Sequence, residues 1–177
     1  AATRHHRYLY ALAIYAPLAL AWSLPAVFTL AAVGCWLLVP MIAGSWQSRL
    51  AYLTFVGTSA ATFTVIYAAF LSRQDPTTLA FMHRFWAASF FPWQTPLEWP
   101  HWLVTIHTGE LLAYPCGGNH GASVITTVAC GAGILWLLRQ QRQLAAALLL
   151  PFAFCLVASA LQRYPYGYLN RTSVFLA

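Results

Sequence analysis

The most restrictive feature of this sequence is a series of long, uncharged apolar runs separated by short connections that carry arginine. No residue from Tyr8 to Ala43 is charged, and similar runs recur toward the C-terminal end. Hydrophobic residues make up 60% of the chain and charged residues 7%, whereas a soluble domain has roughly a quarter charged residues. A water-exposed surface cannot be built from so few charges. The sequence therefore predicts an all-α fold, a polytopic transmembrane helix bundle.

The apolar runs define the spanning segments. One helix over 8–43 would be about 54 Å long, far more than the roughly 30 Å hydrocarbon core, so a tight turn at Ser23, Leu24 and Pro25 between two helices fits better. We expect one transmembrane domain fragment over 1–177. Its predicted spans cover about 8–22, 26–43, 50–71, 122–138 and 144–161, with the start of another at 172. Because the chain begins without Met and stops within an apolar run, we expect it to be incomplete at both ends.

Residues 73–120 differ in composition from the runs around them. They contain all three acidic residues and half of the tryptophans. Tryptophan and proline at this density are typical of the membrane interface, where an indole can bury its ring and keep its N–H in water. We predict a loop with an amphipathic interfacial helix over 79–91, a proline-broken crossing, and a second short helix over 101–114.

The arginines favour one orientation, because short cytoplasmic connections are enriched in positive charge. All nine cations are arginines. With the N-terminal end in the cytoplasm, five of them lie in short inner connections: Arg4, Arg7, Arg49, Arg139 and Arg142. The loop 73–120 is then extracytoplasmic, as are Arg163 and Arg171. The net charge of +6 favours anionic lipid or phosphate contact over nucleic acid, because the arginines form no stripe with stacking aromatics.

The segment "LQRYPYGYLNR", residues 161–171, is a candidate phosphate site. Arg163 follows one predicted span and Arg171 precedes the next. The planar guanidinium binds phosphate through two charge-assisted hydrogen bonds, and Tyr164 and Tyr166 can donate phenolic hydrogen bonds. A simpler alternative stays open: arginine and tyrosine at a helix end often extend to lipid headgroups and do nothing more.

The loop offers few groups for metal or redox chemistry. His107 and Glu110 would share a helix face if 101–114 is helical, a spacing that suits a hydrogen-bonded pair or a metal. No further ligand stands at tight spacing, so an interfacial hydrogen bond is favoured and we predict no metal site. The four cysteines form no close pair, which argues against a disulfide framework. We predict no cofactor.

Four stretches together resemble one family. They are "WSLPAVF" (22–28), "FMHRFWAASFFPWQTPLEWPHWLV" (81–104), "RQQRQ" (139–143) and "ASALQRYPYGYLNRTSVFLA" (158–177). In order and spacing they are similar to the C-terminal half of bacterial polytopic glycosyltransferases of the GT-C superfamily, which are related to the dolichyl-phosphate-mannose protein mannosyltransferases and the lipid A aminoarabinose transferase. The likeness covers nearly the whole chain. The last stretch is the most specific of the four.

The resemblance implies a transferase in the bacterial inner membrane that moves a sugar from a polyprenyl-phosphate donor to an extracytoplasmic acceptor. It implies donor-phosphate contacts for Arg163, Tyr164 and Arg171, and outer-loop contacts for Arg84, His107 and Glu110. The three residues "YLN" separate Gly167 from Arg171, which is more than the family pattern has. The family's catalytic acids lie in a first outer loop that these residues do not include, so no catalytic residue is assigned.

The alternative is a non-catalytic transmembrane accessory or scaffold subunit of a larger membrane complex, with other membrane subunits as partners. An outer loop with paired acidic residues upstream of Ala1 would favour the transferase. A transporter fits less well, because no charge interrupts a predicted span at mid-membrane depth, where substrate and ion sites usually lie.

Overall fold

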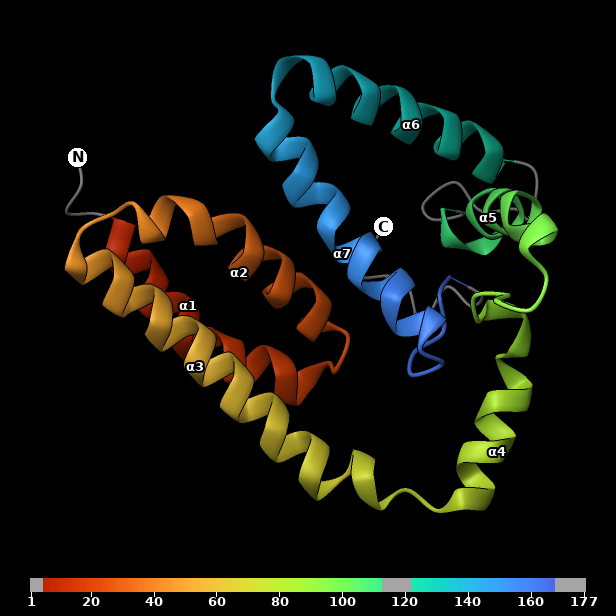
Figure 1. Cartoon of the computed structure of the whole chain (residues 1–177), viewed down its shortest axis with the longest axis horizontal. Helices are drawn as coiled ribbons and strands as arrows, with labels where there is room; N and C mark the ends of the chain where they lie inside the picture. The colour runs from red at the N-terminus through yellow and green to blue at the C-terminus, as the bar shows by residue number, and fades with distance from the viewer. Residues whose placement is uncertain (1–4, 113–121, 168–177) are drawn as a thin grey trace. The chain divides into compact units, whose positions relative to one another are not determined.

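The computed structural model describes residues 5–112 and 122–167, and all regular structure in these ranges is helical. The described residues contain seven α-helices joined by short 3₁₀ and π-helical turns. They divide into two compact units, one up to Asp75 and one from Pro76 onward, and each is described by itself (Figure 1). The predicted all-α class is confirmed.

The first unit contains three long helices. They are α1 (His5–Trp22), α2 (Ala26–Ile42) and α3 (Trp46–Ala69), followed by the 3₁₀ turn η2 (Leu71–Arg73). The predicted break at Ser23–Pro25 is confirmed, because α1 ends one residue before it and α2 begins one residue after it. Both α1 and α2 pack on α3. Their shared core is small: Ala13, Ala16 and Phe55 are buried and lie against Leu12, Leu30 and Val33.

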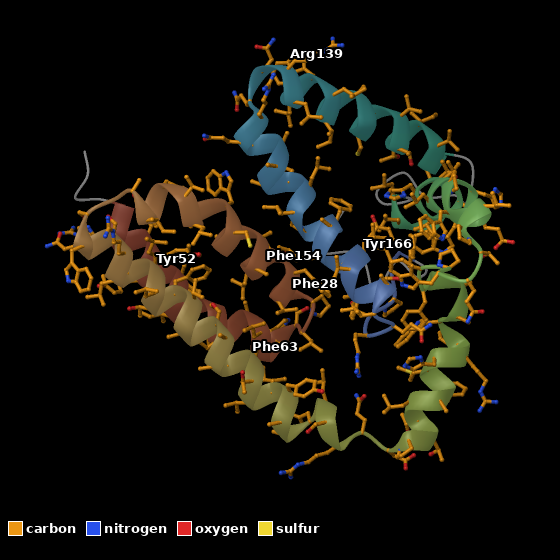
Figure 2. All side chains as sticks on the ribbon, viewed as in Figure 1. Phe28, Tyr52, Phe63, Arg139, Phe154 and Tyr166 are labelled. Carbon is orange, nitrogen blue, oxygen red and sulfur yellow. The ribbon has the colours of Figure 1, made fainter. Side chains whose placement is uncertain are left out.

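Several hydroxyl groups along α3 donate to carbonyls of the same helix. Thr54 donates to the carbonyl of Leu50 at 2.9 Å and Thr64 to that of Ala60 at 2.9 Å. Tyr52, labelled in Figure 2, instead donates to the carbonyl of Gly34 on α2 at 2.9 Å. In a bilayer, where no water can pair with them, such hydroxyls are tolerated because each has a backbone partner.

The second unit contains four α-helices, which are α4 (Pro76–Phe85), α5 (Trp99–Ile106), α6 (Ala122–Gln140) and α7 (Arg142–Ala160). One-turn helices at Ala87–Ser89 and Pro96–Glu98 separate α4 from α5. A π-helical segment, η5 (His107–Leu111), follows α5 directly. Figure 1 shows α6 and α7 diverging from their connection at Gln141, with α5 lying near the other end of α6.

Within the described residues, three helices are long and apolar enough to cross a membrane. They lie at Trp46–Arg73, Ser123–Gln140 and Arg142–Ala160, and little of each is buried within the protein. Their exposed apolar surface needs a lipid environment, so the chain is an integral, multi-pass membrane protein in contact with the bilayer. α2 is apolar but shorter, and the crossings expected over 8–22 and 26–43 stay predictions although both ranges are helical.

The C-terminal end of α7 is closed by a Schellman motif. The N–H of Arg163 donates to the carbonyl of Ala158 at 2.8 Å, and the N–H of Gln162 donates to that of Ser159 at 2.9 Å. Gln162 has φ 54°, the left-handed conformation that this motif requires and that glycine usually supplies. The helix therefore stops sharply, and Arg163 begins the next turn.

Candidate functional site at the end of helix α7

The segment after α7 folds back into the protein. Arg163 is exposed, Tyr164 is half-buried, and Pro165, Tyr166 and Gly167 are buried. The N–H of Tyr166 donates to the carbonyl of Ser89 at 3.0 Å, across the chain from its own helix. The turn therefore presents an exposed guanidinium on a backbone held by buried neighbours.

Ser159, in the last turn of α7, links that helix to residues 89–91. Its buried hydroxyl donates to the carbonyl of Ser89 at 2.9 Å and accepts from the N–H of Phe91 at 3.0 Å. The indole N–H of Trp93 donates to the carbonyl of Ala160 at 2.7 Å. Residues 89–93 thus form hydrogen bonds with the Ser159 hydroxyl and with the carbonyl of Ala160. The end of the helix leaves that carbonyl without a partner inside the helix.

An aromatic cluster surrounds these hydrogen bonds. It consists of Phe91, Trp93, Trp99, Trp102 and Tyr166, with neighbouring ring centroids 4.9–5.9 Å apart. Two further indoles are fixed by backbone carbonyls: Trp99 donates to Pro92 at 2.8 Å and Trp102 to Ala88 at 2.9 Å. Three of the loop's four tryptophans therefore pack in this cluster with their N–H groups paired, whereas the buried indole N–H of Trp86 has no partner among the described residues.

His107 links the cluster to α5. Its Nδ1 lies 2.8 Å from the carbonyl oxygen of Leu103, and its Nε2 lies 3.1 Å from the hydroxyl of Tyr166. A carbonyl oxygen can only accept, so Nδ1 carries a proton; in the neutral ring Nε2 then accepts from the tyrosine hydroxyl. The interfacial hydrogen bond predicted for this histidine has Tyr166 as its partner.

The π-helical segment ties the same region to α6. Gly109 has φ −85° and ψ −112°, so the helix does not continue regularly and the proposed common helical face for His107 and Glu110 does not apply. The carbonyl of His107 accepts from the Thr127 hydroxyl at 2.8 Å, and the carbonyl of Thr108 accepts from the Ser123 hydroxyl. Hydroxyls of α6 thereby satisfy carbonyls that the irregular backbone frees.

A basic connection joins α6 and α7 at one end of the pair, and the candidate site lies at the other end. Figure 2 labels Arg139 at that connection and Tyr166 at the other end. The N-terminal turn of α6 and the C-terminal turn of α7 both bond to the loop. Residues 89–93, Thr108 and the turn at 161–167 therefore lie at one end of the pair.

The other predicted site residues are Arg84, Glu110 and Arg171. Arg84 is exposed in the last turn of α4 and donates from Nε to the carbonyl of Ala80 at 3.4 Å within its own helix. Glu110 lies in the π-helical segment, and its side chain is outside what the structure describes. Arg171 also lies outside the described residues. Among the residues that are described, no three of the His, Cys, Asp and Glu side chains are grouped to hold a metal ion.

Sequence reasoning did not single out the residues that build this site. Ser89, Ser159 and Trp93 carry its long-range hydrogen bonds, and Tyr166 was considered only as a donor in the turn. Nothing in their local spacing identifies them, because their partners lie 59–70 residues away. Comparisons with protein-family models, with curated proteins and with solved structures give no match to this chain.

Burial of the two tyrosines predicts a loss of stability at alkaline pH. Burial, with a smaller contribution from Cys155, raises the pKa of both Tyr164 and Tyr166. Above about pH 10, where a tyrosine of the unfolded chain ionises, the unfolded state binds fewer protons than the folded state. The contribution of these two tyrosines to the free energy of unfolding should therefore be constant below that pH and fall above it.

The measurement is chemical unfolding in detergent micelles between pH 7 and pH 11. The variant with both Tyr164→Phe and Tyr166→Phe should show a shallower alkaline decline than the wild type. An equally steep decline in the double variant would assign the effect to other groups.

Proposed function

We propose that this chain belongs to a membrane glycosyltransferase that moves a sugar from a polyprenyl-phosphate donor to an extracytoplasmic acceptor. The observation that carries the proposal is the placement of Arg163. It is an exposed cation directly after a spanning helix, and the turn that bears it is fixed by the buried residues that follow. The phosphate of a membrane lipid lies at the depth where spanning helices end, so this guanidinium can meet it with little ordering cost.

The roles proposed for neighbouring residues follow from the same arrangement. Tyr164, next to Arg163, contributes a phenolic group at the donor phosphate, and Arg171 is the proposed second cation. Arg84 and Glu110 are proposed outer-loop contacts. His107 is proposed to hold Tyr166 in position through their hydrogen bond. No residue is assigned as the general base. The site is proposed to face the outside of a bacterial inner membrane, with the basic connection at Arg139 and Arg142 in the cytoplasm.

A binding experiment on the full chain in lipid nanodiscs tests this proposal. Arg163→Ala should weaken binding of a polyprenyl-phosphate hexose about tenfold, the order expected for one charge-assisted contact. Arg163→Lys should recover part of the loss, because it restores charge but not the bidentate geometry. The matched control is Arg142→Ala, which removes the same side chain at the other end of α7 and should leave binding unchanged.

Two outcomes would contradict the assignment. Equal losses in Arg163→Ala and Arg142→Ala would indicate a general effect of membrane charge rather than a site. Unchanged binding in Arg163→Ala would remove this arginine from the donor site.

A non-catalytic membrane subunit is the second candidate, and a specific observation favours it. Tyr166, His107, Trp99 and Trp102 are all hydrogen-bonded to one another or to backbone carbonyls, as expected for groups that hold a loop in shape. Purified protein that binds the lipid-linked sugar but transfers none to any acceptor, while copurifying with a stable partner, would favour this alternative.

A further inference from the structure

We infer that the exposed face of Trp93 is a sugar-binding surface beside Arg163, so that one helix end recognises both parts of a lipid-linked sugar phosphate. This inference rests on the proposed function and adds to it the residue that would distinguish a glycosylated donor from the bare lipid phosphate. Its basis is the position, the orientation and the exposure of a single indole ring.

The position is fixed by a hydrogen bond to the end of α7. The indole N–H of Trp93 donates to the carbonyl of Ala160, the last residue of that helix. In the Schellman motif, the N–H of Arg163 donates to the carbonyl of Ala158. The indole of Trp93 and the backbone N–H of Arg163 are therefore attached to carbonyls in the same final turn of α7.

The orientation of the ring is fixed by its aromatic neighbours. The rings of Phe91 and Trp93 have centroids 5.0 Å apart and an interplanar angle of 71°, and those of Trp93 and Trp99 are 5.8 Å apart at 88°. Trp99 is itself held by its bond to the carbonyl of Pro92. These contacts hold the ring of Trp93 in place before a ligand binds, so binding costs little further side-chain entropy.

Despite these contacts Trp93 remains 55% exposed. The other rings of the cluster are half-buried or, like Tyr166 at 3%, buried, so Trp93 is its exposed member. The free face of an indole is the negative side of its quadrupole. The C–H groups on the apolar face of a pyranose carry partial positive charge and fit that surface, while the sugar hydroxyls stay in water.

The combination of the Trp93 indole with the Arg163 guanidinium limits which ligands can contact both groups. In a polyprenyl-phosphate hexose one glycosidic oxygen joins the sugar to the phosphate, so the groups that recognise them must lie close together. Trp93 and Arg163 are both attached to the last turn of α7, and the end of a spanning helix is where a lipid presents its head. A glycan without phosphate would use only the indole, and a phospholipid without sugar would use only the guanidinium.

The experiment compares two probes, polyprenyl phosphate and polyprenyl-phosphate hexose, with the full chain in lipid nanodiscs. The wild type should bind the hexosyl form roughly tenfold tighter than the bare phosphate, the upper range for one aromatic contact. Trp93→Ala should bind both probes equally, with affinity for the bare phosphate retained. Trp93→Phe keeps a ring but no N–H donor and should retain most of the preference. Leu97→Ala, which removes another highly exposed apolar side chain of the same loop, should behave as the wild type.

The outcomes separate this inference from the proposed function. If the wild type prefers the hexosyl lipid and Trp93→Ala keeps that preference, the sugar contact is elsewhere and the inference fails while the donor proposal stands. If Trp93→Phe loses the preference as fully as Trp93→Ala, an aromatic ring held by Phe91 and Trp99 at this position does not bind the sugar, which also overturns the inference. If the wild type binds neither lipid, both fail.

Discussion

Gly167→Ala is expected to lower the free energy of unfolding by about 2–5 kcal/mol, combining a left-handed backbone with an overpacked site. Gly167 has φ 74°, a conformation that alanine adopts at a cost. A Cβ atom there would lie 2.8 Å from Cγ2 of Ile106 and 3.1 Å from Cβ of Leu111. Neither neighbour can move freely, because Ile106 ends α5 and both are buried.

The measurement is reversible unfolding in mixed micelles, followed by tryptophan fluorescence from the aromatic cluster. Gly131→Ala in α6 is the control, since a Cβ at that position meets nothing within 4 Å, and it should leave stability unchanged or slightly raised. Similar stability of Gly167→Ala and the wild type would show that the turn can relax, contrary to the packing described above.

Ser159→Ala is expected to cost about 2–4 kcal/mol, because it removes two buried hydrogen bonds and leaves the N–H of Phe91 without its partner. The carbonyl of Ser89 keeps the N–H of Tyr166 as a donor, so the larger part of the loss comes from the Phe91 amide. Hydrogen exchange of that amide should accelerate in the variant.

Ser72→Ala provides the comparison, since that exposed hydroxyl bonds only to the carbonyl of Ala68 at 3.0 Å. Its effect on stability should stay within about 0.5 kcal/mol. If both serine variants lost equally little, the bridge between α7 and the loop would contribute no net stability.

The helices could be predicted because their determinants are local. Apolar runs predict a segment over 50–71, and α3 begins at Trp46 because the Ser45 hydroxyl accepts from the N–H of Ser48 and caps it. The run marks the part that suits lipid, whereas the cap sets where the helix starts, so the two boundaries differ by a few residues. The break at Pro25 was predictable for the same local reason.

The site could be predicted only in part. The exposed Arg163 after a helix was visible in the sequence, and so was the interfacial character of the tryptophans. The burial of Tyr166 and the role of Ser159 were not, because they depend on contacts with residues 89, 91 and 107. The interruption at Gly109 was missed because the surrounding residues are typical of a continuous helix.

The bridge between residues 89–93 and the end of α7 also constrains how the chain is made. Ser89 leaves the ribosome 70 residues before its partner Ser159, which corresponds to roughly 4–14 s at ordinary rates of synthesis. During that interval the indole N–H of Trp93 and the backbone N–H of Phe91 lack the groups of α7 that accept from them. Membrane insertion of α6 and α7 is therefore the step that permits the loop to acquire its final shape, and defects in their insertion would leave an aromatic surface exposed to chaperones and proteases.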